Sequence, residues 1–266
     1  MPHRTRRNRR YLAAEIGTHP ALELAFVWNR SRDAIPPHLP ILENLGDFAA
    51  RGADLIVEMA HPAISREYAA KFLKEADYMP GSPSCFADRN LEAAVAAAAA
   101  EANGHGCYVP RGALPGLGDV LDMAGRGDLA RASVTMKKDP PAIKWAGPEP
   151  PPEAAASGET TLFAGSVRDA CVNAPNNVNT MAVLALASGL GLDAVAAKIV
   201  VDPASTDHVV EVRVEGHPRP DGSRFTLDLK RTNPADPGAV TGSATYASFF
   251  ASLLAANGAG DGIHFR

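Results

Sequence analysis

The sequence predicts an α/β protein built from two domains. Up to Pro110, short apolar runs alternate with helical patterns, as in a parallel sheet whose strands are buried on both faces. After Pro110, segments of β-type composition follow one another with few helices between them, which indicates a mostly antiparallel sheet. With 266 residues, of which 46% are hydrophobic, the chain is long enough to bury one large core or two modest ones.

The first domain is predicted to be Rossmann-like and to span residues 1–112. Its apolar run Leu24–Trp28 is bounded by charged residues, as expected of a buried parallel strand. The segment 41–50 then supplies a crossover to a second strand at Asp54–Met59. The other elements expected here are helices at 11–16, 64–75 and 90–103, and strands at Asp77–Met79 and Gly106–Val109.

The second domain is predicted to be α+β and to span residues 113–240. The segment 138–157, rich in Pro, Gly and Ala, is expected to be an internal loop, because strands of one sheet lie on both sides of it. A final apolar helix is expected at 241–256, and residues 241–266 are a candidate to pack back on the first domain. The expected strands are 133–137, 160–164, 197–201, 208–215 and 224–230, with helices at 117–124 and 177–188.

Composition narrows the function classes. The net charge of −4 and the pI of about 6.1 give no general argument for binding nucleic acid or a membrane surface. The three cysteines are too few and too scattered for a disulfide framework or a CxxC metal site, so no metal is expected and a reducing cytoplasm is the default. No apolar run approaches the roughly 20 residues that span a bilayer. An open sheet in the second domain usually finds a partner, so we expect a homodimer.

The first ten residues, MPHRTRRNRR, do not fit the predicted fold. A dinucleotide-binding domain of this type begins with a short apolar strand that runs into Gly-x-Gly-x-x-Gly, whose glycines let a pyrophosphate approach the first helix. Here the strand and the glycines are missing, and arginines in a central strand would bury unpaired charge. Two explanations are open: a frameshift before residue 10, such that the alternative reading frame of residues 2–9 encodes an apolar strand and a Gly-rich turn, or a protein that has lost its phosphate loop. The nucleotide sequence distinguishes them.

The segment 163–191 carries the most informative motif, FAGSVRDACVNAPNNVNTMAVLALASGLG. A Gly-Ser turn ends a short strand, an Asn-rich turn follows, and Asn177-Val-Asn179-Thr180 enters an apolar helix. Asn and Thr are good N-cap residues, and a helix N-terminus offers unpaired N–H groups to a carboxamide or carboxylate. The alternative interpretation is a capped helix in the core, without a ligand.

Together with this motif, six further segments resemble the L-aspartate dehydrogenase family in order and spacing, most closely its aspartate dehydrogenase domain-containing branch. These segments are LELAFVWNRSRD, ADLIVEMAHPAI, GSPSCFAD, VPRGALPGLGDV, VVDPASTDHVVEVRVEG and KRTNPADPGAVTGSAT. The resemblance implies an oxidoreductase with NAD or NADP as cofactor. Its substrate would be L-aspartate, converted to iminoaspartate, which hydrolyses to oxaloacetate and ammonia or feeds NAD biosynthesis.

The same resemblance implies where the cofactor lies. The family's Ser-Gly-Ala turn corresponds to Arg111-Gly112-Ala113, so the backbone of Gly112 and Ala113 is expected to meet the dinucleotide. Asn177 and Asn179 correspond to an Asn-x-Asn pair that lies against the cofactor. Simple capping is the structural alternative for this pair, and both interpretations can hold.

Two further cofactor contacts are expected at strand ends of the first domain. After Trp28, the strand end carries Asn29 and Arg30 where enzymes that use NAD usually have an acidic residue, so NADP is expected to be accepted at least as well as NAD. The alternative is that Arg30 is a solvated loop charge. His61 follows the next strand, at the carboxyl edge where parallel sheets bind ligands.

The resemblance implies a catalytic histidine on the strand after the Asp202-Pro203 turn, and the only nearby histidine is His208. Imidazole can exchange a proton with an amine or with attacking water near neutral pH. Aligned without a gap, His208 falls two positions early and Val210 occupies the family's catalytic place. The alternative is a surface histidine at a strand start. Lys137 and Lys198 are candidates to neutralise a substrate carboxylate.

Three function classes therefore follow from the sequence. The first is the L-aspartate dehydrogenase. The second is a non-catalytic relative that keeps the fold as a binding or dimer-forming protein, favoured by the missing glycines and the shifted histidine. The third is a dehydrogenase for another small amino acid, because a fold does not fix its substrate.

Overall fold

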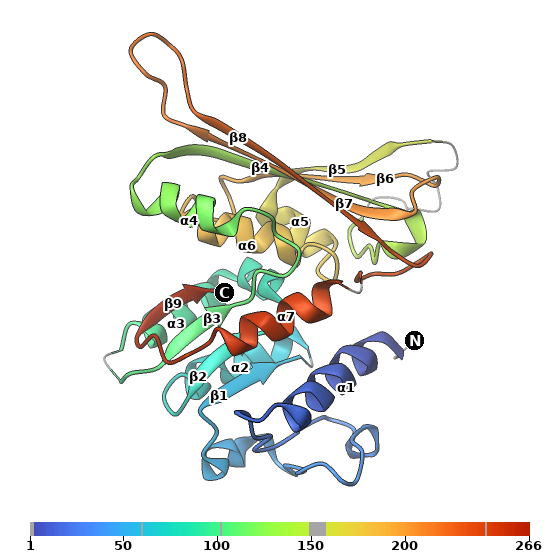
Figure 1. Ribbon diagram of the computed structural model, residues 1–266, viewed down its shortest axis with the longest axis vertical. Helices are drawn as coiled ribbons and strands as arrows, with labels where there is room; N and C mark the ends of the chain where they lie inside the picture. The colour runs from blue at the N-terminus through green and yellow to red at the C-terminus, as the bar shows by residue number, and fades with distance from the viewer. Residues whose placement is uncertain (1–2, 60, 102, 149–157, 243) are drawn as a thin grey trace. The chain divides into compact units, whose positions relative to one another are not determined.

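The computed structural model describes residues 3–59, 61–101, 103–148, 158–242 and 244–266, and it confirms the predicted α/β class (Figure 1). The chain divides into two compact units. The first comprises residues 1–82, 90–110 and 250–266, and the second comprises residues 83–89 and 111–249. Four short 3-10 helices accompany the main elements, η1 (Arg32–Ala34), η2 (Leu45–Arg51), η3 (Pro83–Ala87) and η4 (Pro140–Ala142).

The first unit contains a four-stranded parallel sheet with the strand order β1-β2-β3-β9. The residues of β2 and β3 are buried throughout, as expected of strands covered on both faces. The strands are β1 (Leu55–Glu58), β2 (Asp77–Pro80), β3 (Gly106–Val109) and β9 (Gly262–Phe265), and the helices are α1 (His3–Thr18), α2 (Pro62–Phe72) and α3 (Arg89–Ala99).

Helix α2 shows how the sequence sets these elements. Pro62 stands at its first turn, where no backbone N–H is needed, and the His61 side chain caps it by accepting a hydrogen bond from Ala63 N at 3.1 Å. Its buried residues, Ser65, Ala69 and Phe72, recur at spacings of three and four. The helix therefore buries one stripe and exposes the rest.

Three expectations for the first unit were wrong. Leu24–Trp28 is not a strand, because its only ladder contact is the single bridge between Val27 and Ile41, and its side chains are half-buried. A strand needs a neighbour to pair with, and β1 stands at the end of the sheet. The first helix begins at His3 rather than at residue 11, and the chain ends in the strand β9, which the sequence analysis missed.

The second unit contains a five-stranded sheet with the order β5-β6-β4-β7-β8, in which β4 and β6 are parallel and the other neighbours antiparallel. Helices α4, α5 and α6 lie on one face of this sheet (Figure 1). The strands are β4 (Leu129–Lys138), β5 (Thr160–Ser166), β6 (Ala196–Val201), β7 (Asp207–Gly216) and β8 (Thr226–Pro234). The helices are α4 (Leu117–Gly125), α5 (Val167–Asn173) and α6 (Asn179–Ala187), and α7 (Ala244–Leu254) runs across the division between the units.

The two faces of this sheet differ in chemistry. The helix-covered face buries alternate residues of β4 and β7, whereas the opposite face carries exposed ion pairs such as Lys230 with Glu211 and Arg213 with Asp228. The segment 83–89, expected within the range 1–112, belongs to the second unit. Arg168 of α5 holds it by donating hydrogen bonds to the carbonyls of Phe86 and Ala87 at 3.1 and 2.8 Å.

Candidate active site

A tight turn and the start of α6 come together in the second unit. Gly112 has φ of +58°, a left-handed conformation that favours glycine, and Leu114 N donates to Arg111 O across the turn at 3.1 Å. A Cβ added at Gly112 would lie 4.0 Å from Oγ1 of Thr180, the second residue of α6. Ser248 Oγ donates to Gly112 O at 2.7 Å and fixes the turn. The Gly112–Ala113 backbone thus lies beside the helix N-terminus.

Asn179 is the first residue of α6. Its Oδ1 accepts a hydrogen bond from Ser84 N at 3.2 Å, which orients the amide. Within the described residues no protein group accepts from its Nδ2, and the side chain is half-buried. This nitrogen is a donor for a ligand carbonyl oxygen, beside the backbone N–H groups of the helix start.

Asn177 has a different role from Asn179. Its side chain is 7% exposed, its Oδ1 accepts from Lys144 N at 2.7 Å, and its Nδ2 donates to Ala142 O at 2.8 Å. Both ends of the amide therefore bind the loop that follows β4. Asn177 does not cap α6, whose N-cap is Val178, and its side chain instead fixes the position of that loop.

A buried pair of ionisable side chains lies on the helix-covered face of the sheet. Lys137 of β4 pairs with Val209 of β7 in antiparallel register, so the adjoining residues Lys138 and His208 are cross-strand neighbours, with Cβ atoms expected about 5 Å apart. Each is 5% exposed. Lys138 Nζ donates to Val240 O at 2.8 Å. The sequence analysis considered Lys137 and missed Lys138.

The signal for Lys138 was present in the sequence. Val134 and Met136 alternate with Ser133 and Thr135, so the apolar series of β4 continues to Lys138 and leaves Lys137 on the other face. Lys137 indeed lies on the opposite face of β4 and forms an ion pair with Glu159 at 3.1 Å. Lys198 is exposed on β6. Neither lysine shares the buried face with His208.

Burial lowers the pKa of Lys138 from its usual 10.5 to about 8, because desolvation penalises the charged form more than the nearby Asp139 favours it. The unfolded chain therefore binds more protons than the folded chain between about pH 8 and 10.5. The contribution of Lys138 to the free energy of unfolding therefore rises with pH between about pH 8 and 10.5. Below pH 8 the full cost of the buried charge, about 3 kcal/mol, is present.

We therefore expect Lys138→Met to stabilise the protein at pH 7 by about 2 kcal/mol. The substitution removes the burial cost of about 3 kcal/mol, and it loses a hydrogen bond worth about 1 kcal/mol. Denaturant unfolding at pH 7 and pH 10 measures this, and the advantage should narrow at pH 10, where the native lysine is already neutral. Lys137→Met is the matched control, because the Glu159 carboxylate raises the pKa of Lys137 and its loss should not stabilise. A Lys138→Met variant less stable than wild type at pH 7 would contradict the expectation.

His208 lies on the same face of β7 as Val210, the position to which the resemblance assigns the family's histidine. Val210 and His208 are both buried on the same side of β7, one pleat repeat apart, which corresponds to about 7 Å along the strand. A Cβ added at Gly242 would lie 3.9 Å from His208 Nδ1. The alternative of a surface histidine is wrong, because His208 is buried.

Of the residues predicted in the first unit, His61 lies just after the carboxyl end of β1. His61 is exposed and serves as N-cap of α2, while its N–H donates to Glu58 Oε1 at 2.7 Å. Arg30 is exposed in a loop, and Asn29 lines a cavity together with Glu58.

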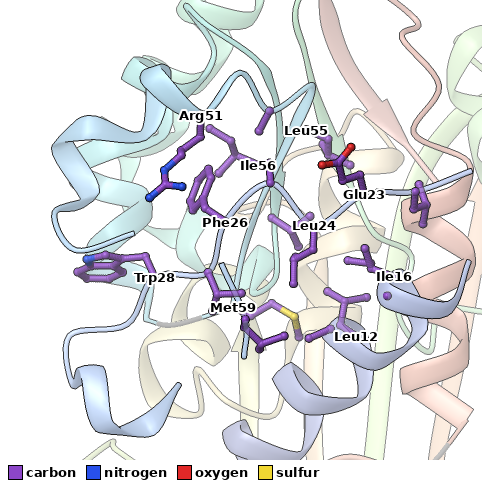
Figure 2. Close-up of a pocket in the computed structure, with 18 of the residues that line it drawn as sticks. Leu12, Ile16, Glu23, Leu24, Phe26, Trp28, Arg51, Leu55, Ile56 and Met59 are labelled. Carbon is purple, nitrogen blue, oxygen red and sulfur yellow. The ribbon is translucent and has the colours of Figure 1, made fainter. Parts of the chain in front are cut away.

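That cavity has a volume of about 1280 Å³ and lies beside the edge of β1 that has no strand neighbour (Figure 2). Its walls are largely apolar, with Leu12 and Ile16 of α1 on one side and with Leu24, Phe26 and, from β1, Ile56 close to one another (Figure 2). The described residues of the first unit offer no glycine cradle for the pyrophosphate of a dinucleotide.

Among the described residues, no cluster of three or more His, Cys, Asp or Glu side chains is placed to hold a metal ion. Within the same residues, every helix is too short or too polar to cross a bilayer.

Two family models match the chain. The model for "Aspartate dehydrogenase, C-terminal" matches residues 119–252, which include Lys138, Asn179 and His208. The model for "Homoserine dehydrogenase, NAD binding domain" matches residues 9–110. Together they cover both structural units.

Individual relatives agree with these models. The aspartate dehydrogenase domain-containing protein of Xenopus tropicalis is 44% identical, with 96% of this chain and 93% of that protein aligned. The L-aspartate dehydrogenase of Brucella anthropi is 34% identical over 77% of this chain and 76% of its own length. The crystal structure of aspartate dehydrogenase from Thermotoga maritima shares the fold, with a TM-score of 0.68, 20% identity and 92% of each chain covered.

Proposed function

Because the chain belongs to the aspartate dehydrogenase family, we propose that it is an NAD(P)-dependent L-aspartate dehydrogenase. The hydrogen on Cα of L-aspartate leaves with its electron pair, the nitrogen loses protons, and iminoaspartate forms, which takes up water to give oxaloacetate and ammonia. The cofactor, NAD or NADP, supplies the hydride acceptor. Binding, orientation and proton transfer are left to side chains of this protein.

The observation that carries the proposal is the buried pair of Lys138 and His208 within the segment matched by the aspartate dehydrogenase model. In the proposed reaction, the His208 imidazole accepts a proton from the substrate ammonium and assists the attack of water on the imine. Burial among apolar neighbours excludes bulk water from this proton exchange. The helices that cover this face of the sheet supply that environment.

Asn179, Gly112 and Ala113 are the proposed contacts of the nicotinamide carboxamide. Support comes from the amide nitrogen of Asn179, which has no acceptor among the described residues, and from the turn fixed beside the start of α6. Asn177 supports them indirectly, because it holds the loop after β4.

In the first unit, Asn29, Arg30 and His61 are the proposed contacts of the nucleotide. Arg32 forms an ion pair with Glu43 at 3.1 Å, so Arg30 is the better candidate for a 2′-phosphate. This favours NADP at least as much as NAD.

The test is nucleotide binding followed by turnover. Calorimetry with NAD and NADP is followed by L-aspartate-dependent reduction of the nucleotide, with L-alanine as the control substrate. We expect reduction with L-aspartate and little with L-alanine. Absence of reduction in the purified protein, and also in a variant that carries a glycine-rich turn before α1, would reject the proposal.

One observation favours a second candidate, a non-catalytic relative. The first unit offers no glycine cradle among its described residues, which weakens pyrophosphate binding. In either case we propose a cytoplasmic homodimer that pairs through the exposed face of the five-stranded sheet, and light scattering of the purified protein tests the dimer.

A further inference from the structure

Lys138 is a buried cation whose charge is compensated only in part, because the attraction of the nearby Asp139 is smaller than the cost of burial. Its Nζ can donate three hydrogen bonds, and the described residues supply one acceptor, the carbonyl of Val240. Within the described residues no carboxylate lies within ion-pair distance of it. A buried ammonium without an anion is unfavourable unless another group brings the opposite charge.

Lys138 lies at a fixed position next to His208 in the sheet. It is the last residue of β4, on the helix-covered face, and its cross-strand neighbour is His208. The loop that follows is fixed from two sides, because Asn177 binds its backbone at Ala142 and Lys144 and Gly238 N donates to Asp139 Oδ2 at 2.7 Å. A flexible lysine is therefore held at a defined place beside the proposed proton acceptor.

We propose that the Lys138 ammonium binds a carboxylate of a short dicarboxylic substrate and thereby selects acidic amino acids for reaction at His208; this inference rests on the proposed dehydrogenase function. The carboxylate replaces the Val240 carbonyl as the principal acceptor, and it compensates the charge that Asp139 compensates only in part. Lys137 cannot take this role, because it lies on the opposite face with Glu159.

Succinate is the probe, because it carries two carboxylates and lacks the amino group, so that its binding is measured without turnover. Calorimetric titration compares the full-length wild-type protein with Lys138→Met, Lys138→Arg and Lys137→Met. We expect Lys138→Met to weaken succinate binding at least about tenfold, the loss of a charge-assisted hydrogen bond, while Lys138→Arg retains part of it. Lys137→Met should bind as wild type does. Propionate, with one carboxylate, should bind more weakly than succinate.

The outcomes separate this inference from the proposed function. Lys138-dependent succinate binding without turnover, both in the native protein and in the variant that carries a glycine-rich turn before α1, would support the lysine role and reject the dehydrogenase. If Lys138→Met turns over L-aspartate with an unchanged KM, the dehydrogenase function is supported and the role of Lys138 in binding the carboxylate is rejected. Failure of the wild-type protein to bind succinate at millimolar concentration, or equal binding by Lys138→Met, would overturn the lysine role. Circular dichroism of each variant checks that the fold is retained.

Discussion

Replacing residues 2–9 by an apolar strand that ends in Gly-x-Gly-x-x-Gly is expected to tighten binding of NAD or NADP at least about 100-fold. β1 has one edge without a strand neighbour, and a cavity of about 1280 Å³ lined by apolar side chains lies beside it. The same cavity is also lined by Leu24–Trp28, which has strand-like composition and, among the described residues, a single bridge. An added strand would pair with β1, and the glycines would present backbone N–H groups to the pyrophosphate.

Calorimetry with each nucleotide measures this effect, and thermal unfolding measures the gain from filling the cavity. The matched control carries the same strand with alanines in place of the three glycines, which should restore stability but not nucleotide affinity. Micromolar binding of NAD or NADP by the unmodified chain would contradict the expectation. It would show that this protein builds a phosphate site without glycines.

Leu24–Trp28 was predicted as a strand but does not form one, and the reason lies outside this segment. Its composition predicts a buried strand, and that local preference is real. Strand formation also requires a partner that comes from a distant part of the chain. Because the N-terminal segment forms the helix α1, the partner is absent from the described residues and the run stays irregular. The sequence pattern of a short segment therefore does not show whether a strand from a distant part of the chain is there to pair with it.

In the second unit, sequence reasoning came closer. The strands were predicted within a few residues of their observed bounds, because one polar and one covered face give a clear alternation. In the first unit, by contrast, β9 was missed because it is only four residues long and follows a Gly-rich segment. Its pairing with β3 is again a long-range contact that short patterns do not encode.

For the candidate site, too, some residues could be predicted from the sequence and others could not. His208 and Asn179 were found from motifs, whereas Lys138 required the parity of β4 to be followed to its last residue. A strand predicted to end one residue earlier removes Lys138 from consideration. The role of Asn177 could not be predicted, because its two partners belong to a loop more than 30 residues earlier in the chain.

His208→Asn is expected to lower kcat for L-aspartate by about 10² to 10⁴, with a smaller change in KM. Asn is shorter, keeps hydrogen-bonding capacity and cannot accept a proton near neutral pH, so it removes proton exchange while leaving a polar group on β7. Steady-state kinetics measures the effect in whichever form of the protein turns over, native or with the glycine-rich turn. A variant that retains most of the wild-type kcat would reject His208 as proton acceptor.

The double variant His208→Val with Val210→His tests the register of this strand. Both positions face the covered side of β7, about 7 Å apart, so the exchange moves the imidazole without changing the face on which it lies. If His208 works beside Lys138, the exchange takes the imidazole away from the lysine, and activity should stay as low as in His208→Asn. Higher activity in the exchanged variant than in His208→Asn would show that the productive place is position 210. The native histidine would then be two residues out of register, and the non-catalytic alternative would gain support.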